Sequence, residues 1–143
     1  MNYDRRMSRR PVLVFVAAAA LAQVGLAAPV HAEPAEPAAP PCDFRLSAPL
    51  VVQLSGTNVV TATVEPAGCG VAAQVTLSIA CVQMQGSESA EQCSQTSGPG
   101  TASVYFAPYR PGATYVATGR GCASVGNPSR SICQTTGPLT ATL

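Results

Sequence analysis

The chain has 143 residues, of which 47% are hydrophobic and 10% are charged, and its formal net charge is +1. Its only histidine, His31, lies in the first 32 residues, and the rest of the chain has four arginines against six carboxylates, with no lysine or tryptophan. This composition argues against nucleic-acid binding, which needs a basic stripe, and against an enzyme that relies on an imidazole or lysine base.

Residues 1–32 have the three parts of a secretory signal peptide. Arginines form a basic start, an apolar run extends from Val12 to Ala28, and Val30-His31-Ala32 supplies the small residues of a cleavage site. The apolar run is short for a hydrocarbon core of roughly 30 Å. We therefore expect cleavage after Ala32 and no membrane span in the mature chain, with an uncleaved anchor as the alternative. Arg9-Arg10 leaves the twin-arginine route open beside the general secretory route.

Residues 33–41 are rich in proline and alanine, a composition that indicates an extended spacer or a disordered terminus. The following residues, 42–143, are enough for one domain. Their hydrophobic pattern alternates with period two, and no helical periodicity is found. The alternation and apolar runs predict strands at Leu50–Leu54, Val60–Val64, Val75–Cys81, Ala102–Phe106, Tyr115–Thr118 and Leu139–Leu143.

Dipeptides that contain glycine or proline, such as Ser55-Gly56 and Pro111-Gly112, separate these segments. Strands that are apolar on one face and polar on the other are typical of a two-sheet sandwich, in which each sheet turns its polar face to water. The sequence therefore predicts an all-β, two-sheet sandwich of about seven strands.

Six cysteines follow the predicted signal peptide, at intervals of 27, 12, 12, 29 and 11 residues. In an exported chain such a set indicates disulfides, and without histidine the spacing does not fit a zinc site, so we expect no metal and no cofactor. Sequence alone does not resolve the connectivity. Hairpin geometry favours the local pairs Cys42–Cys69, Cys81–Cys93 and Cys122–Cys133, with an inter-sheet Cys69–Cys122 bridge as the alternative.

Residues 109–118, Tyr-Arg-Pro-Gly-Ala-Thr-Tyr-Val-Ala-Thr, resemble the stretch of fibronectin type III domains in which a Pro-Gly turn leads into strand F. The resemblance implies an immunoglobulin-like or fibronectin type III-like sandwich. It also implies a tyrosine corner, in which Tyr115 buries its ring and bonds its hydroxyl group to nearby backbone. The chain departs from that family in having six cysteines and no tryptophan.

Gly112–Tyr115 and Gly119–Cys122, followed by Cys133, resemble a hairpin of the neocarzinostatin-type apoproteins. Those proteins are secreted immunoglobulin-like sandwiches that bind a small aromatic antibiotic in a cleft, so the resemblance implies a small-molecule carrier. As a whole, the chain is similar to the small secreted cysteine-containing proteins of GC-rich Gram-positive bacteria.

Glu88 and Glu91 are candidates for the carboxylate pair of a glycosidase. They lie in a Ser- and Gln-rich segment between two cysteines, and such a segment should be wet, whereas a carboxylic acid catalyst needs a dry pocket. We therefore interpret them as solvated loop charges, and no catalytic residue is predicted.

Arg120 lies just before, and Arg130 near the end of, residues 122–133, which the sequence predicts to be a disulfide-tied loop at one end of the sandwich. Arginine offers forked donors, and a rigid loop lowers the entropy cost of docking. The plain alternative is a stapled turn with solvated arginines. An aromatic-lined cleft between the sheets would favour a small-molecule ligand, and a rigid loop over a filled core would favour a protein partner.

We therefore expect a secreted or envelope-associated monomer that acts as a non-enzymatic binding or structural module. Its partner would be an extracellular protein or small ligand. The alternatives are a carrier of the chromoprotein kind and an inhibitor of a secreted hydrolase.

Overall fold

The computed structural model describes residues 39–70 and 72–143. The predicted signal peptide, its cleavage site and most of the predicted spacer lie outside the described residues. The described part belongs to one compact unit. No helix in it is long and apolar enough to cross a membrane.

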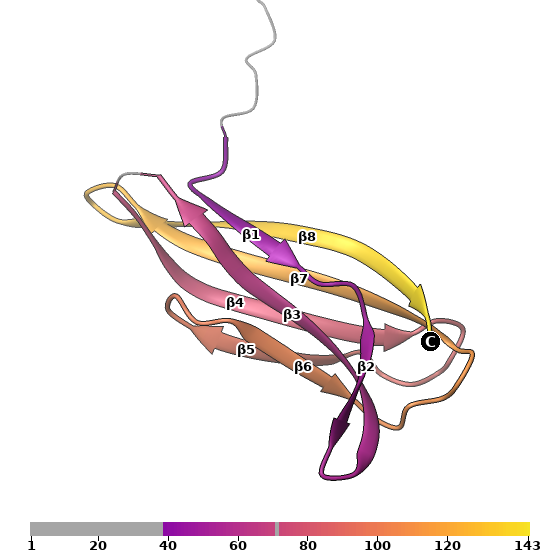
Figure 1. Ribbon diagram of the computed structural model, residues 1–143. Coiled ribbons are helices and arrows are strands. Elements are labelled where there is room, and N and C mark those ends of the chain that lie inside the picture. Colours follow the sequence, from indigo (N-terminus) through magenta and orange to yellow (C-terminus); the bar gives the residue numbers. More distant parts are fainter. Residues whose placement is uncertain (1–38, 71) are drawn as a thin grey trace, which may run out of the picture. The chain divides into compact units, whose positions relative to one another are not determined.

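Strands account for all the regular structure in the described part of the chain (Figure 1). The eight strands are β1 (Cys42–Leu46), β2 (Leu50–Leu54), β3 (Thr57–Cys69), β4 (Ala73–Met84), β5 (Gln92–Ser97), β6 (Ala102–Phe106), β7 (Thr114–Val125) and β8 (Arg130–Thr142).

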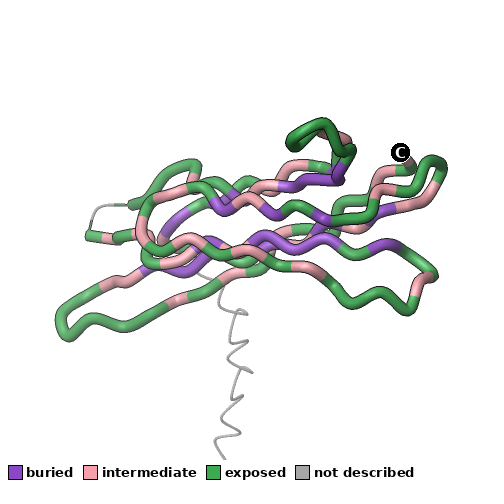
Figure 2. Tube along the Cα trace, turned by 90° about the horizontal axis from the view of Figure 1, so that it is seen from below, coloured by how far each residue is buried: buried purple, intermediate pink, exposed green. Residues whose placement is uncertain are grey.

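The strands form two antiparallel four-stranded sheets. In sheet 1, β6 pairs with one side of β3, while β1 and β2 follow one another along its other side. In sheet 2 the strand order is β5-β4-β7-β8. The buried residues, purple in Figure 2, lie where the two layers face each other. The predicted all-β, two-sheet sandwich is confirmed, with eight strands where about seven are expected.

Aliphatic and aromatic side chains from both sheets fill the space between them. Val60, Ala62 and Val64 of β3 alternate into this core and are fully buried, as their period-two pattern predicts. Phe106 of sheet 1 packs edge-on against Tyr115 of sheet 2, with ring centroids 5.6 Å apart. Each such buried large side chain contributes about 1.5–3 kcal/mol of hydrophobic stabilisation.

Tyr115 forms the tyrosine corner that the fibronectin type III resemblance implies. Its ring is fully buried, and its hydroxyl oxygen accepts a hydrogen bond from the Arg110 backbone N–H at 2.8 Å. The bond joins the loop before β7 to the second residue of that strand and so fixes where the strand enters the core.

Val75 of β4 packs against the core, but a bulge between Val75 and Leu77 turns the rest of the apolar row outward, contrary to the expectation that apolar rows point inward. Leu77 and Ile79 are half-buried on the outer face of sheet 2, whereas Ser78 and Ala80 are completely buried. The strand extends to Met84, and its inward row ends in apolar residues as well. Both rows of the complete strand are therefore mainly apolar, and periodicity alone does not decide which one faces the core.

Candidate functional site

All three disulfides join neighbouring strands of the same sheet. Cys42–Cys69 links β1 to β3, Cys81–Cys93 links β4 to β5, and Cys122–Cys133 links β7 to β8. The predicted local pairing is confirmed, and the alternative bridge between the sheets is not formed.

One cluster of candidate metal ligands contains two cysteines that are joined in a disulfide. Within the described residues, Cys81, Cys93 and Glu91 offer ligand atoms that lie within 4.8 Å of one another. Because the two sulfur atoms are bonded to each other, neither is a thiolate that could ligate an ion. Glu91 instead accepts a hydrogen bond from the Thr118 hydroxyl at 3.1 Å. Like Glu88, it is exposed.

Residues 122–133 are not the loop that the sequence predicts. β7 continues to Val125 and β8 begins at Arg130, so the turn is confined to residues 126–129. Pairing is unbroken from Cys122 opposite Cys133 to Val125 opposite Arg130. The disulfide therefore lies within a two-stranded ribbon, whose ladder hydrogen bonds hold the segment extended.

Arg120 and Arg130 lie on opposite faces of this ribbon, because side chains alternate along a strand. Arg120 is two residues from Cys122 and shares its face, whereas Arg130 is three residues from Cys133 and faces the other way. About five residues of strand, roughly 17 Å, also separate their positions along the ladder. The structure therefore does not bring together the two arginines that the sequence suggests as anchors of one loop.

Arg120 belongs to the outer face of sheet 2. Its neighbour Gly121 faces the core, where an added Cβ would lie 2.3 Å from the Phe44 ring. The register places exposed Arg120 between Ile79 of β4 and Thr135 of β8, in one row across three strands.

This row borders an open groove of about 450 Å³. Apolar contact is available from Ile79 and from Cys81 of the β4–β5 disulfide, and hydroxyl groups come from Thr118 and Thr135. Arg120 supplies the guanidinium group, and the Glu91 carboxylate lies beside the groove through its hydrogen bond to Thr118. The full lining is Ile79, Cys81, Thr118, Gly119, Arg120, Thr135, Thr136, Gly137 and Pro138. Such a surface can hold a partner by apolar contact and hydrogen bonds.

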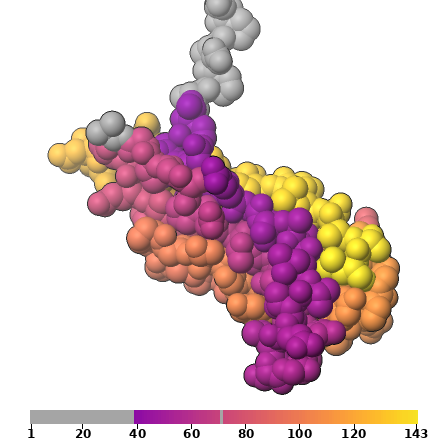
Figure 3. Space-filling model, viewed as in Figure 1, coloured from indigo at the N-terminus to yellow at the C-terminus, as the bar shows by residue number. Residues whose placement is uncertain are grey.

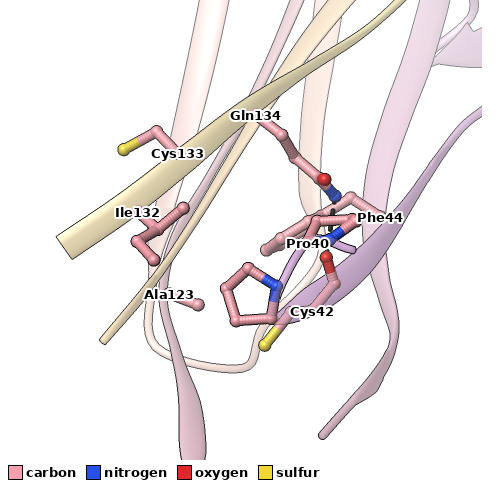
Figure 4. Close-up of a pocket in the computed structure, with 8 residues that line it drawn as sticks. Pro40, Cys42, Phe44, Ala123, Ile132, Cys133 and Gln134 are labelled. Carbon is pink, nitrogen blue, oxygen red and sulfur yellow. Dashed lines mark hydrogen bonds between the residues drawn. The ribbon is translucent and has the colours of Figure 1, made fainter. Parts of the chain in front are cut away.

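A second cavity lies at the margin between the sheets, where the end of the predicted spacer meets the domain (Figure 4). Ala123 and Ile132 from sheet 2 face Pro40 and Cys42 there, and the Gln134 side-chain amide donates to the Cys42 carbonyl at 2.8 Å. Its volume is about 10 Å³, close to the space that one water molecule needs. This cavity is therefore too small for a ligand.

The groove is not evident from the sequence because its row joins β4 to β7 and β8, and β5 and β6 separate β4 from these two strands in the chain. The one available signal is the apolar alternation of Leu77 and Ile79, which is equally compatible with an inward face. Comparisons with protein-family models, with curated proteins and with solved structures found no match to this chain.

Proposed function

We propose that the protein is an exported, non-enzymatic binding module that recognises a protein partner with the outer face of sheet 2. The observation that carries this proposal is the groove around Arg120, on a sheet whose two hairpins are each closed by a disulfide. A surface held in this way is ordered before binding, which lowers the entropy cost of association. Arginine is also enriched at protein interfaces relative to other charged residues.

Export is supported by three disulfides within the described residues, since such bonds persist in oxidising compartments. The signal-like leader also supports export, either to the extracellular space or to the cell envelope. A binding role fits the composition, because no histidine or lysine follows residue 32.

The strand order supports an immunoglobulin-like interpretation of the sandwich. In immunoglobulin domains the strands C, F and G form one sheet, and A, B and E belong to the other. In this chain β4, β7 and β8 are neighbours in one sheet, and β3 pairs with β1 and β6 in the other. Domains of this architecture commonly act by binding, although architecture alone does not assign a ligand.

A carrier of a small molecule is the second candidate, because the groove volume lies within the roughly 300–1,000 Å³ of small-molecule pockets. Two observations favour a protein partner instead. The groove lining contains no aromatic residue, and the space between the sheets is filled by the core. The third alternative, an inhibitor of a secreted hydrolase, needs a docking loop at 122–133, where the structure has a ribbon.

The test compares two arginines of equal charge on opposite faces of sheet 2. The oxidised protein is immobilised to capture partners from the source culture medium, and the captured molecules are identified by mass spectrometry. Affinity for each recovered partner is then measured by calorimetry with Arg120→Ala and with Arg130→Ala. We expect Arg120→Ala to weaken binding by about 30-fold, a loss of about 2 kcal/mol, and Arg130→Ala to leave it unchanged. Equal effects of the two substitutions would contradict the assignment of this face.

A further inference from the structure

The β2–β3 hairpin leaves one strand edge of sheet 1 open. Among the described strands only β3 pairs with β2, so the other side of β2 has unpaired N–H and C=O groups. In Figure 1 the hairpin extends beyond its neighbours, and in Figure 3 it forms a projecting magenta lobe. The open edge is therefore accessible to another strand.

Two other edge strands carry features that block strand pairing. β1 has Asp43 and Arg45, with a bulge after Asp43, and β8 contains Pro138. By contrast, no charged residue occurs from Leu46 to Val64, a range that includes all of β2 and its turn. β2 itself contains neither proline nor glycine. An apolar, uncharged edge of this kind is a template for pairing unless it is covered.

Apolar side chains surround this edge. Leu50 and Leu54 of β2 are 45% and 42% exposed, and Tyr105 of β6 is 48% exposed. The register places Leu50, Thr61 and Tyr105 in one row across sheet 1. This row lies on the outer face, because the residues on either side of Thr61 in β3 face the core.

We propose that two copies of this chain associate by pairing their β2 strands antiparallel, around a twofold axis at Val52. The segment Leu-Val-Val-Gln-Leu is nearly symmetric about that residue. Leu50 of each copy then faces Leu54 of the other, and Val51 faces Gln53. No like charges meet, because the whole hairpin is uncharged.

The hydrogen-bond phase of the existing ladder agrees with this register. The Ser55-Gly56 turn has φ angles of 50° and 83°, as in the type I′ turns of two-residue hairpins. Leu54 opposite Thr57 closes the hairpin as a hydrogen-bonded pair, and such pairs alternate along an antiparallel ladder. Val51 and Gln53 therefore direct their backbone groups to the free edge. They are also the residues that would face each other across the twofold axis.

The chain's own spacer is a poor occupant of this edge. Residues 33–41 include four prolines, which lack the N–H needed for a ladder. The spacer also meets the domain at Cys42, which pairs with Cys69 at the opposite end of β3 from the β2 hairpin. A second copy of β2 has a backbone N–H on every residue, and it is not attached at the far end of β3.

The contact would be small. A strand of five residues with its adjacent leucines buries less than the roughly 800 Å² per partner of stable complexes. We therefore expect a dissociation constant on the order of 10–100 μM. The protein would then be a weak dimer, in place of the monomer that the sequence suggests.

Sedimentation velocity of the oxidised protein, from roughly 1 μM to 1 mM, tests the proposal across this range. The double variant Leu50→Lys/Leu54→Lys brings like charges together and should weaken dimerisation at least tenfold. The double variant Leu50→Glu/Leu54→Lys brings opposite charges together only in the antiparallel register and should restore it. Leu139→Lys, at a leucine of β8 that is 38% exposed, is the matched control and should dimerise like the unmodified protein.

Gln53→Pro provides a second, backbone test, since it removes an N–H that faces the free edge and leaves the β2–β3 bonds in place. It should abolish dimerisation while the thermal melting of the dilute monomer stays nearly unchanged. The proposal is overturned if the unmodified protein stays monomeric at every concentration, or if the Glu/Lys variant associates no better than the Lys/Lys variant. It is also overturned if Leu139→Lys disrupts association as strongly as the β2 substitutions.

Discussion

Gly121 and Phe44 form a contact between the sheets that leaves no room for a side chain at position 121. Three ring atoms of Phe44 would lie 2.3 Å from a Cβ at Gly121, whereas ordinary contacts begin near 3.4 Å. In Gly121→Ala the ring must therefore move by more than 1 Å. Phe44 is only 9% exposed, and the nearby Cys42–Cys69 disulfide ties its strand to β3. The substitution should consequently produce strain rather than a free shift.

Overpacking of this kind costs about 1–3 kcal/mol, and replacing a strand glycine by alanine returns about 0.5–1 kcal/mol through chain entropy. Given the restrained position of Phe44, we expect Gly121→Ala to lower the free energy of unfolding by about 2 kcal/mol. For a domain of this size such a loss shifts the melting temperature by roughly 8–16 °C.

A double-mutant cycle isolates the contact from the general effect of the substitution. In a Phe44→Ala background the ring is gone, so Gly121→Ala should be neutral or stabilising by about 0.5 kcal/mol. The four proteins are compared by urea denaturation with disulfides intact. The coupling energy should be about 2–3 kcal/mol. If Gly121→Ala costs the same in both backgrounds, the Phe44 ring is not what excludes a side chain there.

Two further substitutions test polar groups in the core. Ser78 is fully buried, and its Oγ has no hydrogen-bond partner among the described residues. Ser78→Ala should therefore raise the free energy of unfolding by about 1 kcal/mol. A decrease would show that the hydroxyl group has a hydrogen-bond partner in solution. Tyr115→Phe leaves the Arg110 N–H without its acceptor and should lower the free energy of unfolding by about 1–2 kcal/mol in the same assay. An unchanged value would show that the tyrosine corner does not stabilise the fold.

Local patterns predict the strands whose side chains alternate clearly. The expected segments Leu50–Leu54 and Ala102–Phe106 coincide with β2 and β6. The local disulfide scheme is likewise correct, because each pair bridges strands that are adjacent in one sheet. These features depend on short-range periodicity and turn chemistry, which a single sequence contains.

The remaining features depend on pairing between distant segments. β5, with the sequence Gln-Cys-Ser-Gln-Thr-Ser, has no apolar alternation and is held as a strand by its ladder with β4. In the same way, pairing with β7 extends β8 through residues that the sequence assigns to a loop. The outward position of Ile79 and its alignment with Arg120 follow from the register of sheet 2. Composition alone does not contain that information.

The two proposed surfaces belong to different sheets, and this separation has a consequence for binding. Arg120 lies on the outer face of sheet 2, whereas β2 is an edge of sheet 1. Pairing of two β2 strands would therefore leave the Arg120 groove of each copy open. A dimer of this form presents two copies of the groove to one partner, and a partner with repeated epitopes gains avidity without any new contact. A weak dimer is sufficient for this effect, because binding to such a partner holds the two copies together.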